Sequence, residues 1–199
     1  MNTPAAVAKE VRAYVFDRLE PRGFKRRDIF LLRERDHGIH DWIALPHVVE
    51  AKNGPVLVTA NVGLYVAPVH ALLGGDVSAT FCRNIGYFSP AAAYATWPFA
   101  REAFSEESAR ELFGTLVSYG LPLMESFRTY DQVIAGCERF GLKYLNVSRI
   151  PALRLLAGRK EEAVLAIQSS LREFAGKVDA YSEHQAAVLT ALLAHAHQG

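Results

Sequence analysis

The sequence predicts an α+β fold, a four-stranded, mainly antiparallel sheet with an N-terminal helix on one face and a helical C-terminal half. Two observations carry this prediction. Apolar and polar side chains alternate through residues 39–51 and 56–67, which is the period of a strand. From residue 105 onward, apolar residues recur at helical spacing instead. Half of the 199 residues are hydrophobic, so the chain can bury a large core.

The N-terminal helix is predicted over residues 4–19. Thr3 is a residue type that caps helices, and Pro4 suits the first helical position because its missing N–H would be unpaired there. Pro21 and Gly23 should end the helix. The apolar residues that should face the sheet recur at helical spacing: Val7, Val11, Tyr14, Val15 and Leu19.

Four strands are predicted, over residues 24–35, 39–51, 56–67 and 81–88. His37-Gly38 should form a turn, and Asn53-Gly54 is the strongest hairpin signal because both residues accept positive φ. In the third strand, one set of side chains should face the core: Val56, Val58, Ala60, Val62, Leu64 and Val66. Residues 89–98 are predicted to be a loop.

Helix-starting and helix-ending residues organise the second half. Ser105 should begin one helix, and Pro122 should kink or restart it. Thr129 and Gln132 form a capping box, and Gly141 should close the helix that follows. Further helices are expected over residues 150–157, 160–175 and 182–196. We therefore expect an α+β domain over 1–141, with C-terminal helices over 142–199 packed on the same domain.

Charge and motifs exclude several classes of function. The formal net charge is +1, which argues against a nucleic-acid binder or a polybasic membrane anchor. No apolar stretch reaches the length of a membrane helix, and no signal-peptide pattern opens the chain, so we expect a cytoplasmic protein. Hydrolase, phosphate-loop, dinucleotide and zinc-protease motifs are absent from the sequence. No catalytic residue is assigned.

The cysteines and histidines indicate neither a disulfide nor a metal site. Cys82 and Cys137 lie far apart, and free thiols are the rule in a reducing cytosol. The seven histidines have no acidic or cysteine partners at the spacing of zinc ligands. We expect no metal and no cofactor.

Two basic features have both a structural and a functional interpretation. The run Arg22–Arg27 could contact phosphates, or it could open an edge strand whose positive charges deter pairing with other chains. Arg83 alternates with Phe81, Ile85 and Tyr87, so it should share a face with them. A half-buried arginine needs a partner, which could be a helix acid or a bound anion.

The sheet face opposite the core is the predicted working surface. It carries aromatic and neutral polar groups where a solvated face would carry lysine and glutamate, and aromatics of this kind dominate binding hot spots. The alternative is that the C-terminal helices bury this face as a second core layer. With Arg83, the candidate binding residues are His40, Trp42, Thr59, Asn61 and Tyr65.

Three segments resemble a known family. They are Leu19–Arg26 leading into a strand, Val58–Leu64, and Arg83-Asn84-Ile85-Gly86 about a dozen residues before Trp97. Together they resemble the bacterial family called domain of unknown function 4304, over about residues 5–140. The resemblance implies a small bacterial cytosolic protein and transfers no catalytic residue. Separately, residues 149–174 resemble one helix pair of a tetratricopeptide repeat, and one pair cannot form a solenoid.

The leading functional hypothesis is a non-catalytic protein-binding module of a bacterial cytosol, with an immunity-like protein as one version. An alternative is a small-molecule enzyme with a pocket between sheet and helices, built around Arg83, Asn61 and a histidine. A further alternative is nucleic-acid binding through the basic strand start. We expect a protein partner, no membrane and no nucleic acid.

The cysteine and histidine patterns predict that neither reductant nor chelator changes stability. Thermal midpoints with and without each reagent should agree within about 2 °C, because in a chain of this size 1 kcal/mol shifts the midpoint by about 2–4 °C. A larger drop in reductant would reveal a disulfide, and a larger drop in chelator would reveal a metal.

Overall fold

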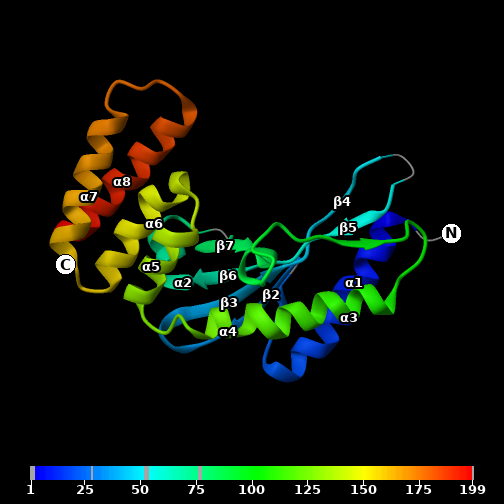
Figure 1. The fold of residues 1–199 in the computed structure, drawn as a ribbon. Helices are drawn as coiled ribbons and strands as arrows, with labels where there is room; N and C mark the ends of the chain where they lie inside the picture. Colours follow the sequence, from blue (N-terminus) through cyan, green and yellow to red (C-terminus); the bar gives the residue numbers. More distant parts are fainter. Residues whose placement is uncertain (1–2, 28, 52–53, 76–77, 199) are drawn as a thin grey trace. The chain divides into compact units, whose positions relative to one another are not determined.

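The computed structural model describes residues 3–27, 29–51, 54–75 and 78–198, and it confirms the α+β class (Figure 1). The described strands are β1 (Lys25–Arg27), β2 (Phe30–Glu34), β3 (Ile39–Ala44), β4 (His47–Val49), β5 (Val56–Val58), β6 (Asn61–Val66), β7 (Phe81–Asn84) and β8 (Trp97–Phe99). They form a five-stranded sheet in the order β1-β2-β3-β6-β7 and a three-stranded sheet in the order β4-β5-β8. The expected single four-stranded sheet is therefore wrong.

Local backbone features explain the extra strands. The segment expected as one strand over 24–35 is an antiparallel hairpin, in which Arg27 pairs with Phe30. The expected turn at His37-Gly38 is confirmed, with φ of 60° and 67°. The expected loop over 89–98 ends in an unexpected strand, β8, in which Trp97 pairs with Val58 of β5. The Asn53-Gly54 hairpin signal lies partly outside the described residues.

The chain divides into two compact units. Unit 1 comprises residues 1–36, 40–64 and 82–126, and unit 2 comprises residues 37–39, 65–81 and 127–199. The predicted division between residues 141 and 142 falls inside unit 2. The packing of the C-terminal helices on the α+β domain stays a prediction.

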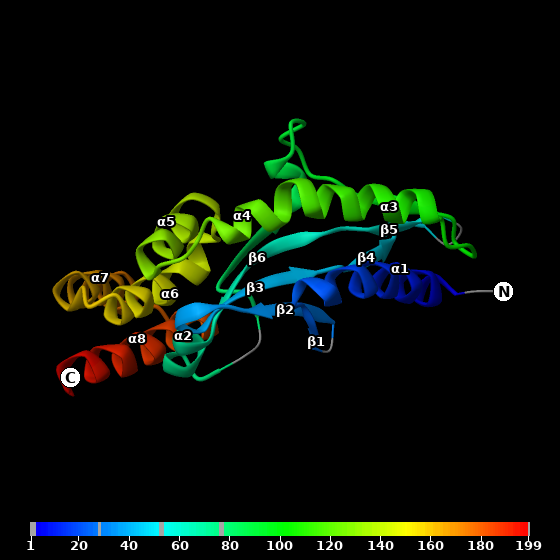
Figure 2. The ribbon, with the colours of Figure 1, turned by 90° about the horizontal axis from the view of Figure 1, so that it is seen from below.

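The helices of unit 1 are α1 (Pro4–Leu19), α3 (Glu106–Thr115) and α4 (Leu121–Glu125), the last two joined by a π-helical turn over Leu116–Gly120. Helix α1 starts where expected, since the Thr3 hydroxyl accepts a hydrogen bond from the Ala6 N–H at 3.2 Å. Ser105 caps α3 in the same way, and Pro122 lies in the first turn of α4. Figures 1 and 2 show α1 and α3 on the same face of the strands of unit 1. Val58 and Val62 on those strands are buried, as expected.

A buried carboxylate joins the β2–β3 hairpin to α4. Asp41 is fully buried on β3, and its two oxygens accept hydrogen bonds from Arg33 at 2.6 Å and Arg35 at 2.9 Å. Arg33 also bonds Glu125 at 3.0 Å, and Arg35 donates to the carbonyl oxygen of Met124 at 2.7 Å. We call these four charged residues the Asp41 cluster. It ties two strands to one helix through charge-assisted hydrogen bonds.

The helices of unit 2 are α2 (Ala67–Leu72), α5 (Tyr130–Phe140), α6 (Lys143–Leu156), α7 (Lys160–Phe174) and α8 (Ala180–Gln198). The capping box of Thr129 and Gln132 at the start of α5 is confirmed. Helix α6 begins seven residues before the expected 150 and continues through Pro151. Successive helices from α5 to α8 pack on one another, and α6 also packs on α2 and α8. No helix of the described residues is both long enough and apolar enough to cross a membrane.

We predict that Asp41→Asn lowers the free energy of unfolding by about 3–5 kcal/mol. The substitution leaves two arginines without the buried carboxylate that compensates them, and breaking such a buried pair is strongly destabilising. Glu106→Gln is the matched control, because Glu106 bonds Arg110 in an exposed pair that should contribute less than about 1 kcal/mol. Urea denaturation measures both. Equal losses in the two variants would show that burial of the Asp41 cluster is unimportant.

Candidate functional site

The structure does not expose the whole of the predicted working face. Trp42 and Thr59 are buried, with 5% and 6% of their surfaces exposed. Trp42 packs against Phe30 on the neighbouring strand, with ring centroids 5.0 Å apart. The exposure expected for Trp42 and Thr59 is therefore wrong, because these two side chains are part of a buried layer.

The other residues of that face are half-buried. Asn61 lies at the start of β6. His40 lies on β3, where burial lowers its pKa and the negative charge of Glu34 partly opposes this shift. Tyr65 belongs to unit 2, where its ring stacks on His70 with centroids 4.6 Å apart. His40 and Asn61 belong to unit 1, so a working surface that joins them to Tyr65 stays a prediction.

Arg83 lies in a different setting, beside two exposed tyrosines. Its guanidinium carbon is 4.3 Å from the centroid of the Tyr87 ring, a cation–π contact. The Tyr87 ring meets Tyr94 edge to face, with centroids 6.5 Å apart. Tyr87 is 40% exposed and Tyr94 is 59% exposed, while Arg83 is half-buried. The three side chains form a continuous aromatic and cationic surface on unit 1.

The tyrosines lie on residues 85–96, which we call the tyrosine loop. The predicted strand over 81–88 is wrong in its second half, because β7 ends at Asn84 and a 3₁₀ turn over Ile85–Phe88 follows. Figure 2 shows this segment projecting from unit 1 beyond α3. The loop is therefore convex, and the two tyrosines are presented on a projection.

A single buried amide holds the two ends of the tyrosine loop together. The Asn84 side-chain oxygen accepts hydrogen bonds from the N–H groups of Gly86 at 3.0 Å and Ala95 at 2.9 Å. Its side-chain nitrogen donates to the carbonyl oxygen of Ala95 at 2.9 Å. Asn84 is only 4% exposed, so water competes little for these bonds. The amide fixes the loop as a closed structure before any partner binds.

Gly86 allows the two ends of the loop to approach closely. A Cβ atom at this position would overlap the carbonyl oxygen of Ala93 and would lie 2.6 Å from the Ala95 Cβ. The carbonyl oxygen of Gly86 also accepts a hydrogen bond from the Ser89 hydroxyl at 2.8 Å. Only glycine fits there without displacing the returning chain.

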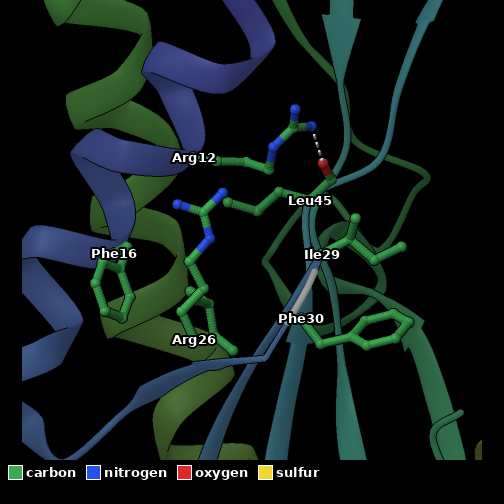
Figure 3. A pocket seen from close by; sticks show the side chains of 7 residues that line it. Arg12, Phe16, Arg26, Ile29, Phe30 and Leu45 are labelled. Carbon is green, nitrogen blue, oxygen red and sulfur yellow. Dashed lines mark hydrogen bonds between the residues drawn. The ribbon is translucent and has the colours of Figure 1, made fainter. Parts of the chain in front are cut away.

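The last three residues of the basic run form the edge strand β1, and the side chains of Lys25 to Arg27 are all exposed. Figure 3 shows Arg12 and Arg26 between α1 and the strands, with Arg12 donating to the carbonyl oxygen of Leu45 at 3.4 Å. Burial, and then the charge of Arg26, lower the pKa of Arg12. The cavity beside them measures about 10 Å³, room for about one water molecule. This pocket therefore cannot hold a substrate.

Two wider depressions flank β1. They measure about 290 and 370 Å³, and Lys25 and Arg26 line both. Glu34 lines the first and Glu20 lines the second, so each depression mixes acid with base. That mixture weakens the positive field that a phosphate backbone would need.

Sequence reasoning selected Arg83 but missed Tyr87 and Tyr94 as its neighbours on the surface. The signal was present in Asn84-Ile85-Gly86, since asparagine side chains bond the backbone two residues on and favour turns. Cys82 and Cys137 are not joined in a disulfide, and burial raises the pKa of Cys137 to about 12. Within the described ranges, no three His, Cys, Asp or Glu side chains gather as a metal site would require.

Comparisons with known proteins add no relative: no family model, no curated protein and no solved structure matches this chain. The resemblance to domain of unknown function 4304 therefore stays an expectation.

We predict that Gly86→Ala destabilises unit 1 by about 1–3 kcal/mol, the usual cost of forcing an extra carbon into a packed site. Gly114→Ala in α3 is the matched control, because no other atom lies within 4 Å of a Cβ built there. It should stabilise the helix by about 0.5–1 kcal/mol through helix propensity. Chemical denaturation measures both. A Gly86→Ala variant as stable as the wild type would mean that the loop is not closed as described.

Proposed function

We propose that this chain is a non-catalytic protein-binding module that engages its partner through the tyrosine loop. The observation that carries the proposal is the surface of Arg83, Tyr87 and Tyr94, presented on a loop whose ends Asn84 holds together. Tyrosine and arginine are the residue types, with tryptophan, that dominate interface energetics. Tyrosine-rich loops on rigid scaffolds serve the same purpose in antibodies.

The shape of the loop favours a protein partner over a small molecule. Small-molecule sites are concave and enclose most of the ligand, whereas the tyrosine loop projects from unit 1 (Figure 2). A projection of this kind fits a groove on another protein. The Arg83 charge favours a partner whose groove carries a carboxylate near an apolar floor for the two rings.

Rigidity supports the same proposal energetically. A mobile loop loses conformational freedom when it binds, and that loss weakens the complex. The bonds of Asn84, and the Ser89 hydroxyl bonded to the Gly86 carbonyl, fix the backbone beforehand. An immunity-like protein of a bacterial cytosol, which plugs the working groove of a toxin, is one concrete version of this function.

The earlier alternatives have weaker support. An enzyme built on Arg83 and Asn61 would need a pocket around the arginine, but Arg83 lies against the face of Tyr87 beside an exposed loop. Nucleic-acid binding through β1 has three exposed basic side chains in its favour and the acids of the flanking depressions against it.

The test compares the wild-type chain with the double variant Tyr87→Ser/Tyr94→Ser. Proteins captured by the wild-type chain are identified, and the most strongly enriched one is purified for calorimetry with both chains. We expect the double variant to bind that partner at least about thirtyfold more weakly, since a hot spot contributes about 2 kcal/mol or more.

Tyr144→Ser is the matched control, because Tyr144 is 52% exposed but belongs to unit 2. It should bind the partner as the wild type does. A partner that binds the double variant and the wild type equally well would place the binding surface elsewhere and overturn the proposal.

A further inference from the structure

The three-stranded sheet of unit 1 ends in a strand that lacks the usual protection against pairing with another chain. Strand β4 (His47–Val49) lies at this edge, with β5 as its only neighbour among the described strands. Figure 1 shows no other described helix or strand of unit 1 beyond β4 on the side away from β5. An open edge is a template for a further strand, so the residues along it decide whether pairing occurs.

The hydrogen-bond pattern of the sheet decides which backbone groups of β4 face outward. The N–H of Thr59 donates to the carbonyl oxygen of Pro46 at 3.0 Å, and these residues are opposite each other in the β4–β5 register. Hydrogen-bonded and non-hydrogen-bonded pairs alternate along an antiparallel ladder. Val48 therefore bonds toward β5, and the N–H and C=O groups of His47 and Val49 point to the open edge.

Two other edge strands of unit 1 carry the features that normally prevent pairing. Strand β1 has three exposed basic side chains, which repel a second strand of the same kind. In β8, Pro98 is opposite Leu57, whose own hydrogen bonds go to β4. Pro98 therefore faces the outer edge, where it offers no N–H donor. Strand β4 contains no lysine, arginine, acid or proline.

The side chains on the outer face of this sheet are apolar. Val48, Leu57 and Pro98 lie directly opposite one another across the three strands. Val48 is 56% exposed, Pro98 is exposed and Leu57 is half-buried. A protected edge would carry a charged side chain at the position of Val48. A strand added to β4 would cover Val48 and extend the apolar row.

We propose that β4 pairs antiparallel with β4 of a second copy of this chain, with Val48 on the two-fold axis. In this register, His47 of each copy lies opposite Val49 of the other, and the outward N–H and C=O groups of each such pair bond one another. The two Val48 side chains meet as a non-hydrogen-bonded pair, where side chains approach most closely. The two sheets join into one continuous sheet across the axis.

Symmetry and charge favour a second copy as the occupant. A strand whose outward groups lie on the two residues that flank a central one is complementary to itself in the antiparallel orientation. Glu50, the first charged residue after β4, would lie opposite Pro46 of the other copy, so like charges do not meet. Burial, and then the charge of Arg12, lower the pKa of His47, so this side chain is uncharged at neutral pH.

The length of β4 sets the expected strength of the dimer. Only three residues of each copy pair, which buries less than the roughly 1,200 Å² of a stable interface. The dimer should therefore be weak and reversible. Sedimentation equilibrium of the full chain measures it between about 1 µM and about 1 mM, the range in which small interfaces dissociate. We expect the average mass to rise from that of the monomer toward twice that value.

Charged variants test whether Val48 lies on the axis. Val48→Lys and Val48→Glu should each weaken the dimer at least about fivefold, because like charges directly opposite on neighbouring strands are destabilising. An equimolar mixture of the two variants should associate again, because a lysine then faces a glutamate. Their thermal midpoints should match that of the wild type, since the site is exposed. Leu165→Lys is the matched control, because Leu165 is 66% exposed but belongs to unit 2, and it should associate as the wild type does.

Cross-linking tests the register. Val48→Cys should form a disulfide between copies under mild oxidation, because the Cα atoms of a non-hydrogen-bonded pair lie about 4.5 Å apart, within the span of a disulfide. Val49→Cys is the matched control in the same strand. Each Val49 lies opposite His47 and not opposite the other Val49, so this variant should cross-link no more than the wild-type chain does.

The proposal is overturned by a chain that stays monomeric up to about 1 mM, which would assign the edge to a strand of another protein. It is also overturned by charged variants that associate as the wild type does, by a mixture that stays monomeric, or by equal cross-linking of Val48→Cys and Val49→Cys. Strand β4 is not part of the tyrosine loop. The Tyr87→Ser/Tyr94→Ser variant should therefore dimerise as the wild type does, and failure of either proposal leaves the other standing.

Discussion

The buried carboxylate of Asp41 is the constraint on which the rest of unit 1 depends. A fully buried charge must be compensated, and Arg33 and Arg35 do this from the neighbouring strand and its end. Arg33 pairs directly with Asp41 across the hairpin, so a slip of one residue would turn the carboxylate to the opposite face. The same arginine lies over the ring of Phe24, the residue before β1, and bonds Glu125. It therefore links the start of β1, the β2–β3 hairpin and α4.

A second buried polar group has the same role at the other end of the sheet. The Asn84 amide replaces the ladder hydrogen bonds that the chain gives up when it leaves β7, and it closes the tyrosine loop without help from a ligand. In unit 2 the Thr80 hydroxyl bonds both the Val66 N–H and His70. In both cases a buried polar side chain accepts a hydrogen bond from a backbone N–H at or just beyond the end of a strand.

The sequence correctly predicts the features that depend only on residues near one another in the chain. Thr3, Ser105 and the Thr129–Gln132 capping box all act as their residue types imply, because capping depends on neighbours within one helical turn. Alternation identified the core face of residues 56–66 correctly, but it could not say what covers the opposite face. Trp42 was therefore expected on a surface and lies in a buried layer, since an aromatic residue suits either place. The role of Asp41 could not be predicted, because its burial depends on segments far away in the chain.

The tyrosine loop satisfies much of its own hydrogen-bonding capacity. The Asn84 side chain makes three hydrogen bonds to backbone, so binding there can gain little from polar bonds to this amide and must come from the rings and the Arg83 charge. Such a surface selects a partner by shape, and shape selection over a projecting loop is the property of a protein groove.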